Sequence, residues 1–316
     1  MYDIIILGSG PSGLTAGIYS VRAGHKTLLI AGTKWGGQLM LTTLVENFPG
    51  FPEGIQGPQL MINMRKQAER LGVDIVNTDF TATDFSKQPF KATAGGKTYQ
   101  GKSIIITTGA DSLWLNVPGE KTLRGKGIST CATCDAFFFR NKNVVVIGGG
   151  DSAMEEAEVL SHVANKVTII HRKDSFRASC AMQEKIFANP KIRVIWNKTI
   201  TKYLGTDKLT GLMLKDVKTG NEKEFKTDGV FLAIGHKPNS TLFKGLDLDE
   251  KGYIVRKEVK NEKSLLKYRM ATNIPGVFVG GDVADYRYKQ AITSAGFGAM
   301  AALDASRWLE ENGLKN

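Results

Sequence analysis

The apolar positions along the chain predict two segments in which a buried strand leads through a glycine-rich turn into a helix. In the first, the apolar run at residues 4–7 precedes Gly8, Gly10 and Gly13, and residues 14–23 show the amphipathic spacing of a helix. A second apolar run at residues 26–32 predicts the next strand. The glycines permit a tight turn, close approach of the backbone to a pyrophosphate and close helix–strand packing, so the segment is typical of a dinucleotide-binding unit.

The same order returns in the middle of the chain. The apolar run at residues 143–147 ends in a glycine-rich turn, a helical pattern follows, and residues 167–170 predict the second strand. One such motif is a weak indication, whereas two copies in a complete strand–turn–helix–strand context indicate two dinucleotide sites. The residues expected at these sites are Gly8, Ser9, Gly10, Pro11, Ser12 and Gly13 in the first copy, and Gly148, Gly150, Asp151, Ser152 and the later Gly235 in the second.

The two copies differ where their second strand ends. The first has Ala31 at the position where a carboxylate commonly binds the ribose 2′-hydroxyl. The second has His171, Arg172 and Lys173, with Arg177 shortly after, and cations there would match a 2′-phosphate. The alternative is a solvated basic loop. We therefore expect NADPH at the second copy and FAD at the first.

A late segment also suits a flavin. Residues 273–279 predict an apolar strand that ends in Gly280, Gly281 and Asp282, and a helix rich in small residues follows from residue 289. A carboxylate at a strand end beside such a helix suits the ribitol and isoalloxazine of FAD. Taken alone, this assignment is weak.

Strands ending at glycine also indicate where the chain passes between domains. The runs at residues 103–112 and 229–239 each precede a change of unit. We expect an α/β protein with two Rossmann-like domains, the NADPH domain being inserted into a discontinuous FAD domain. The predicted boundaries are residues 1–113 and 241–316 for the FAD domain and 114–240 for the NADPH domain.

Composition and charge narrow the class of protein. The 316 residues are 42% hydrophobic and 23% charged, and no apolar run approaches the roughly 18 residues of a membrane span. The N-terminus lacks the pattern of a signal peptide, so we expect a cytoplasmic protein without a membrane anchor. The net charge of +11 is spread along the chain without a basic stripe that alternates with aromatics, which argues against nucleic-acid binding. A basic docking face or a solvated surface explains it better.

Two of the three cysteines lie in the motif Cys131-x-x-Cys134, directly before Asp135. A zinc site would need further ligands, and only Cys180 and four scattered histidines are available, so no metal is expected. Structural packing is a second alternative. A redox dithiol fits best, because placement at a helix start lowers a thiol pKa. Asp135 is either a proton donor and acceptor or a charge that favours the helix N-terminus.

A flavin site, an NADPH site and a dithiol together describe an electron relay. NADPH would reduce the flavin, the flavin would reduce the Cys131–Cys134 disulfide, and the dithiol would reduce an external disulfide by thiolate exchange. Because the cysteines and the flavin belong to different predicted domains, we expect the inserted domain to rotate about hinges near residues 113–118 and 235–240.

The chain resembles the low-molecular-weight thioredoxin reductases over almost its whole length. The residues that carry the resemblance are "GSGPSG", "GGQL", "ENFPG", "CATCD", "VIGGGDSAMEEA", "HRKDSFRA", "AIGHKPN" and "GGDVAD…KQAITSAG", in family order. The resemblance implies NADPH-dependent thioredoxin-disulfide reduction by a homodimer. It also implies that Cys134 lies nearer the flavin, that Cys131 attacks the thioredoxin disulfide and that Asp135 is the acid. The residues it implies at FAD are Gly37, Gln38, Asn47, Gly281, Asp282, Lys289, Gln290 and Ala291.

The sequence departs from the family in a few places. Lys173 and Lys289 stand where arginines are usual, Ala136 replaces a glycine, and the basic stretch at residues 256–270 is longer than usual. The alternative functions are those of proteins with the same fold: a dithiol oxidase, a ferredoxin-linked reductase, or a non-catalytic flavin redox sensor. The cations Arg172, Lys173 and Arg177 argue against the oxidase and the ferredoxin-linked enzyme.

Overall fold

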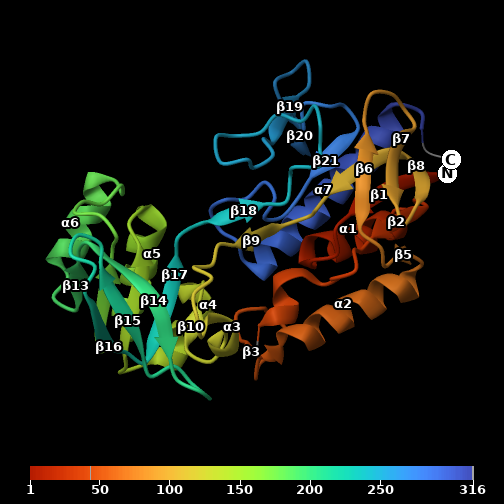
Figure 1. Cartoon of the computed structure of the whole chain (residues 1–316). Helices are drawn as coiled ribbons and strands as arrows, with labels where there is room; N and C mark the ends of the chain where they lie inside the picture. The colour runs from red at the N-terminus through yellow and green to blue at the C-terminus, as the bar shows by residue number, and fades with distance from the viewer. Residues whose placement is uncertain (43, 315–316) are drawn as a thin grey trace. The chain divides into compact units, whose positions relative to one another are not determined.

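The chain folds into two units, each built on a parallel sheet with flanking helices (Figure 1). This is a computed structural model, and it describes residues 1–42 and 44–314. Unit 1 comprises Met1–Asp111 and Lys237–Asn316, and unit 2 comprises Ser112–His236. The predicted α/β class is confirmed.

The parallel core of unit 1 has the strand order β21-β8-β1-β2-β5. Antiparallel strands extend it: β20 and β19 beside β21, and the pair β7 and β6 beside β8. The bounds are β1 Tyr2–Leu7, β2 Thr27–Ile30, β5 Asp74–Val76, β6 Phe80–Asp84, β7 Phe90–Ala94, β8 Lys97–Ile106, β19 Lys257–Lys260, β20 Leu266–Ala271 and β21 Val277–Val279. A separate pair consists of β3 Leu44–Val45 and β4 Ile55–Gln56.

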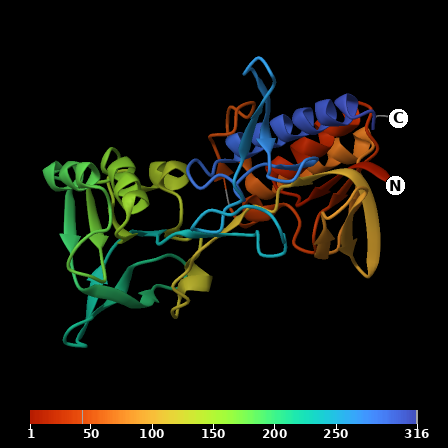
Figure 2. The same cartoon turned by 90° about the horizontal axis from the view of Figure 1, so that it is seen from above.

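Both faces of this sheet are buried, which explains why its strands read as continuous apolar runs. Ile4 and Ile6 of β1 belong to a core shared with α1 and α7, whereas Ile5 and Leu7 pack on the opposite face with residues of β7 and the later loops. The helices of unit 1 are α1 Pro11–Arg22, the short η1 Gly37–Leu41, α2 Gly57–Leu71 and α7 Ala291–Glu311. Figure 2 shows α7, in blue, running along α1, in red.

Unit 2 has a parallel sheet in the order β10-β17-β11-β12-β13 and a smaller antiparallel sheet in the order β14-β15-β16. The helices lie on one side of the parallel sheet and the antiparallel sheet lies on the other (Figure 2). The strands are β10 Ile128–Ser129, β11 Asn143–Gly148, β12 Lys166–Ile170, β13 Ile192–Ile195, β14 Lys198–Leu204, β15 Gly211–Asp216, β16 Glu222–Lys226 and β17 Gly229–Ala233. The helices are α3 Glu120–Leu123, α4 Ala132–Asp135, η2 Ala136–Phe139, α5 Asp151–Ser161 and α6 Cys180–Ala188.

The chain passes between the units at two short strands, β9 Ala110–Ser112 and β18 His236–Pro238, which pair with each other. The segment that follows β9 is held within unit 2. The Glu120 carboxylate accepts the backbone N–H groups of Leu115 and Asn116 at 3.0 and 2.8 Å, and the Arg124 guanidinium stacks 3.6 Å from the Trp114 ring centroid. Within the described ranges, no helix is both long and apolar enough to cross a membrane.

Candidate active site

The first glycine-rich turn joins β1 to α1, and its glycines are required by close backbone approaches. Gly8 has φ +112°, and a Cβ there would lie 2.4 Å from the Thr107 carbonyl oxygen; a Cβ on Gly13 would lie 1.9 Å from the Gly8 oxygen. At Gly10, the residue before α1, a Cβ would meet no atom of the described residues within 4 Å apart from its chain neighbours. The open backbone at the helix N-terminus suits a phosphate.

The Ser9 side chain connects this turn to the end of β2. Its hydroxyl donates to the Ala31 carbonyl oxygen at 2.7 Å and accepts the Gly36 N–H at 3.0 Å. The loop after Gly36 therefore lies against the turn, and a Cβ on Gly37 would lie 3.5 Å from the Gly10 Cα. The family resemblance predicts that Gly37 contacts the cofactor. The Ser9 hydrogen bonds explain why Gly37 lies beside the first glycine-rich turn.

Residues from the end of β21 and from α7 lie next to the same turn. Gly281 has φ +76°, and a Cβ there would lie 2.9 Å from the Ser12 Cβ; a Cβ on Gly298 would lie 2.0 Å from the Ser12 carbonyl oxygen. The Ser12 hydroxyl oxygen is buried and has no hydrogen-bond partner among the residues that the structure describes. A buried hydroxyl without a partner costs free energy unless a ligand or water satisfies it, so this position fits a bound polar group.

Asp282 follows directly and is mostly buried. Ser294 of α7 donates to its carboxylate at 2.6 Å. Burial raises the pKa of Asp282 to about 6, although the Ser294 hydrogen bond opposes this shift. A carboxyl group with this pKa can accept or donate a hydrogen bond near neutral pH.

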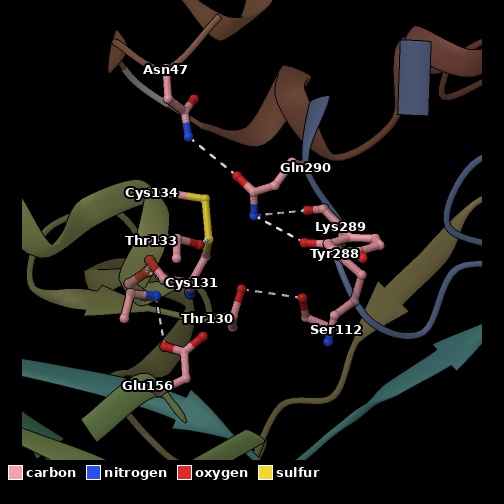
Figure 3. Close-up of a disulfide and its surroundings, with 12 residues drawn as sticks. Asn47, Ser112, Thr130, Cys131, Thr133, Cys134, Glu156, Tyr288, Lys289 and Gln290 are labelled. Atoms are coloured by element: carbon pink, nitrogen blue, oxygen red, sulfur yellow. Dashed lines mark hydrogen bonds between the residues drawn. A yellow bond between two sulfur atoms is a disulfide. The ribbon is translucent and has the colours of Figure 1, made fainter. Parts of the chain in front are cut away.

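The predicted FAD residues Asn47 and Gln290, far apart in the sequence, meet within unit 1. The Asn47 side-chain amide donates to the Gln290 Oε1 at 3.2 Å (Figure 3). Gln290 and Thr293 form a reciprocal capping box at the start of α7, which fixes the Gln290 side chain. Lys289 adopts φ +49°, and its N–H donates to the Asp285 carboxylate at 3.2 Å. The Gln38 amide donates to Asp111 at 2.9 Å rather than to any of these residues.

The second glycine-rich turn joins β11 to α5 and shares two features with the first, a close backbone approach at its first glycine and open backbone at the helix start. A Cβ on Gly148 would lie 2.5 Å from the Ala233 carbonyl oxygen, whereas at Gly150 it would meet nothing in the described chain within 4 Å. The Asp151 carboxylate accepts the Ser179 N–H and hydroxyl at 2.9 and 3.0 Å. The Arg177 N–H donates to the Gly149 carbonyl at 2.7 Å, so the basic segment lies against the turn.

The four basic residues after β12 do not behave alike. Arg172, Lys173 and Arg177 are exposed, but His171 is buried, with its ring against Gly149 and near Phe176 and Trp196. Burial lowers the pKa of His171, and the neighbouring arginines lower it further, so the ring is neutral at pH 7. The expectation that His171 supplies a cation is therefore corrected. Its Nε2 is buried without a hydrogen-bond partner in the described part of the chain and is suited to a ligand hydrogen bond.

Cys131 and Cys134 form a disulfide at the start of the short helix α4, with 5.3 Å between their Cα atoms (Figure 3). Cys131 is half-buried and Cys134 is exposed. The Ser129 hydroxyl accepts the Cys131 N–H at 3.1 Å, and the Thr133 hydroxyl lies 3.3 Å from the Cys131 sulfur. The Thr133 hydroxyl can donate to a thiolate at this sulfur.

Asp135 is half-buried at the end of α4. Burial raises its pKa above the ordinary value for an aspartate, and a hydrogen bond from Ser129 partly opposes the effect. With a raised pKa, the carboxyl group keeps its proton to a higher pH than an ordinary aspartate, which suits a proton donor.

Sequence reasoning missed two carboxylates. Glu156 of α5 accepts the backbone N–H of Ala132 at 2.6 Å (Figure 3), and Asp79 accepts the N–H and hydroxyl of Thr33 just after β2. Both contacts join segments that are distant in the sequence, and no local motif indicates either. Across residues 1–42 and 44–314, no three His, Cys, Asp or Glu side chains cluster as a metal site would require.

Residues 2–298 match the family model described as pyridine nucleotide-disulphide oxidoreductase. The chain belongs to this family, whose members use a flavin and a pyridine nucleotide.

Within the family, the chain is similar to thioredoxin reductases, which confirms the resemblance. A thioredoxin reductase of Streptomyces clavuligerus is 49% identical over 310 residues (97% of this chain, 94% of the relative), and one of Mycolicibacterium smegmatis is 48% identical over 312 residues (98% and 97%). The solved thioredoxin reductase of Giardia duodenalis has a TM-score of 0.91 at 40% identity, covering 98% of this chain and 99% of the other. That of Streptococcus pyogenes has a TM-score of 0.89 at 35% identity, with coverage of 98% and 99%.

Proposed function

We propose that the protein is an NADPH-dependent reductase of thioredoxin that works through FAD and the Cys131–Cys134 disulfide. The single observation that carries this proposal is the disulfide itself: it forms at a helix start, between a hydroxyl-rich segment and a carboxyl group with a raised pKa, in a chain that belongs to a disulphide oxidoreductase family. The similarity to relatives named thioredoxin reductase supports thioredoxin as the substrate.

FAD is assigned to unit 1. Supporting observations are the open backbone at Gly10, the buried Ser12 hydroxyl without a partner, and Asp282 at a strand end beside α7. Gly37, Asn47, Gln290 and Ala291 belong to the same proposed site. Gln38 stays in it as a prediction, and its side-chain amide donates to Asp111.

NADPH is assigned to unit 2. The Gly148–Gly150 turn presents its open backbone at the start of α5, and the exposed cations after β12 lie beside it. Arg172 and Arg177 can bind a 2′-phosphate bidentately, and Lys173 supplies a point charge. These cations favour NADPH over the oxidase and ferredoxin-linked alternatives. The neutral His171 ring can only contribute a hydrogen bond.

When bound, the flavin supplies the two-electron transfer that links NADPH to the disulfide. The Cys131–Cys134 bond then takes up two electrons and two protons and becomes a dithiol. The Cys131 thiolate attacks one sulfur of the thioredoxin disulfide, and a mixed disulfide forms. Attack by Cys134 on Cys131 restores the protein disulfide and releases reduced thioredoxin. Asp135, with its raised pKa, holds the proton that the leaving thiolate requires.

The relay requires motion, because the cysteines belong to unit 2 and the proposed flavin residues to unit 1. A disulfide that accepts electrons from a flavin cannot at the same time reach a protein substrate, so unit 2 is proposed to rotate. The hinge is placed at β9 and β18, because Glu120 and Arg124 hold residues 114–116 to unit 2, contrary to the expectation of a hinge at residues 113–118.

A cross-link between the units, away from both sites, should stop multiple turnover while FAD stays bound; normal cycling would contradict rotation. A homodimer and a cytoplasmic location also remain predictions.

Replacing Cys131 or Cys134 with serine tests the exit route for electrons. We expect NADPH still to bleach the flavin of each variant, because the flavin site and the dithiol are separate parts of the relay. Thioredoxin reduction should fall to background. The matched control is Cys180→Ser, which removes the exposed cysteine outside the pair and should leave both activities intact. Substantial thioredoxin reduction by either pair variant would refute the proposed route.

A further inference from the structure

The helix that carries the redox cysteines is held at its first residue by a side chain from another helix. The Glu156 Oε2 of α5 accepts the Ala132 N–H at 2.6 Å, and Ala132 is buried as the residue that follows Cys131 (Figure 3). The N–H groups at the start of a helix lack partners within the helix, so an acceptor there fixes the helix start. A serine, an asparagine or a water molecule could also supply such an acceptor. A carboxylate adds a negative charge.

The charge lies close to the sulfur of Cys131. Four covalent bonds separate the Ala132 nitrogen from this sulfur, so the carboxylate lies within about 7 Å of it by covalent geometry. A thiolate at a helix start is ordinarily favoured by the free N–H groups and the helix dipole. At this helix, one of those N–H groups already serves Glu156, and the carboxylate repels a negative sulfur. The disulfide carries no charge and is not repelled.

The charged side chains of α4 and α5 are all acidic. In unit 2, α4 packs against α5 and η2. η2 carries no charge, and Arg140 at its end stacks on the Phe137 ring at 5.4 Å. Asp135 on α4 is itself an acid with a raised pKa. The remaining charged residues of α5 are all acidic: Asp151, Glu155 and Glu158.

We propose that Glu156 is a positioning residue that holds the start of α4 and, through its charge, makes the Cys131–Cys134 dithiol a stronger reductant. The carboxylate disfavours the thiolate form of the reduced state and leaves the disulfide unaffected. It therefore shifts the equilibrium toward the disulfide, so that electrons pass more readily to thioredoxin. This inference rests on the proposed function of the pair as a redox dithiol.

The variant Glu156→Gln removes the negative charge but keeps the anchor, because the glutamine amide oxygen still accepts the Ala132 N–H. The variants are made in the full-length, flavin-loaded protein with Cys180→Ser, so that the pair supplies the only thiols. The fraction of Cys131 and Cys134 in the disulfide is measured by alkylation and mass spectrometry in buffers of reduced and oxidised dithiothreitol. The rate of iodoacetamide alkylation as a function of pH gives the midpoint of the reactive thiol.

In Glu156→Gln we expect the alkylation midpoint to fall by about one pH unit, as for the loss of a nearby like charge. The equilibrium with dithiothreitol should shift up to tenfold toward the dithiol, which corresponds to about 30 mV. The shift should vanish at a pH well below the thiol midpoint, where the reduced form carries no thiolate, and should reach its full size above it. Glu156→Ala, which also loses the anchor, should show the charge effect together with lower thermal stability.

Glu158→Gln is the matched control. It removes a carboxylate from the same helix, one that pairs with Lys185 at 3.7 Å instead of approaching α4. We expect its alkylation midpoint and equilibrium to equal those of the parent. A Glu156→Gln protein with the parent midpoint and equilibrium at every pH would overturn the proposal and leave Glu156 as an anchor. These readouts need no thioredoxin, so this failure is distinct from a failure of the parent to reduce thioredoxin with NADPH.

Discussion

The two glycine-rich turns make the same kinds of close backbone approach and differ in the side chains around them. Gly8 and Gly148 each approach a carbonyl oxygen of a neighbouring strand, and Gly10 and Gly150 each present open backbone at a helix start. The third positions differ: Gly13 has no room for a Cβ, whereas Ala153 fills its place in unit 2. The shared close approaches and open helix starts support the proposal that both turns hold a pyrophosphate, and the side chains around them differ.

The two turns differ most clearly at the residue between their first two glycines. In unit 1, Ser9 uses its hydroxyl to join Ala31 and Gly36. In unit 2 the corresponding Gly149 has no side chain because the buried His171 ring lies there; a Cβ would be 2.3 Å from it. His171 thus shapes the turn, and the exposed cations beyond it carry the charge. We therefore propose that selectivity for the dinucleotide depends on the side chains at the end of the second strand.

The largest effect is expected from adding a methyl group at Gly13, the third glycine of the first turn, where the second turn has Ala153. In Gly13→Ala the new Cβ would lie 1.9 Å from the Gly8 oxygen, so the turn or α1 must move. We expect the loss of bound FAD and a decrease of about 3 kcal/mol in the free energy of unfolding. The reverse change, Ala153→Gly, should cost only about 1 kcal/mol and leave the FAD content unchanged. Flavin absorbance per chain and urea unfolding measure both; full FAD in Gly13→Ala would contradict the assigned contact.

The next effect concerns the cations after β12. In a variant with both Arg172→Gln and Lys173→Gln, we expect the KM for NADPH to rise about 10- to 100-fold, because charge-assisted hydrogen bonds to the 2′-phosphate are lost. The KM for NADH should change little. Lys34→Gln, which removes an exposed cation after β2 of unit 1, is the control and should leave both values as in the parent. Equal changes for NADPH and NADH would show that these side chains do not contact the 2′-phosphate.

The smallest effect is the pH dependence that the Asp282 carboxyl group contributes to the stability of unit 1. Because the folded-state pKa of Asp282 is raised from 3.8 to about 6, the native protein holds a proton that the unfolded chain releases in this range. The stabilisation is present below about pH 4 and is lost as pH rises through 6, by about 2 kcal/mol. Urea unfolding of flavin-free parent and Asp282→Asn proteins from pH 4 to 7 should show a larger loss in the parent, because Asp135 and Asp304, whose pKa values are also raised, titrate in both proteins. Parallel profiles would rule out the raised pKa.

Much of the fold and the redox pair could be predicted from the sequence, because the features are local. Buried parallel strands appear as apolar runs, and glycines at fixed spacing report the turns. The pairing of Asn47 with Gln290 and of Glu156 with Ala132 joins distant segments, and no local pattern encodes such contacts. The sequence could not show that His171 is buried, because its neighbours Arg172 and Lys173 are exposed and the pattern around it is polar. The hinge proposed at β9 differs from the one expected at residues 113–118 for a similar reason: no local pattern indicates that the Glu120 side chain anchors residues 115 and 116.

The most direct test of two different dinucleotide sites that serve one disulfide is anaerobic stopped-flow mixing of the purified yellow protein with NADPH or NADH. We expect about one FAD per chain, rapid bleaching of the flavin by NADPH, and much slower bleaching by equal concentrations of NADH. Added oxidised thioredoxin should restore the flavin colour with one disulfide reduced per NADPH consumed. A colourless protein, or equal bleaching rates with the two nucleotides, would contradict the assignment of FAD to unit 1 and NADPH to unit 2.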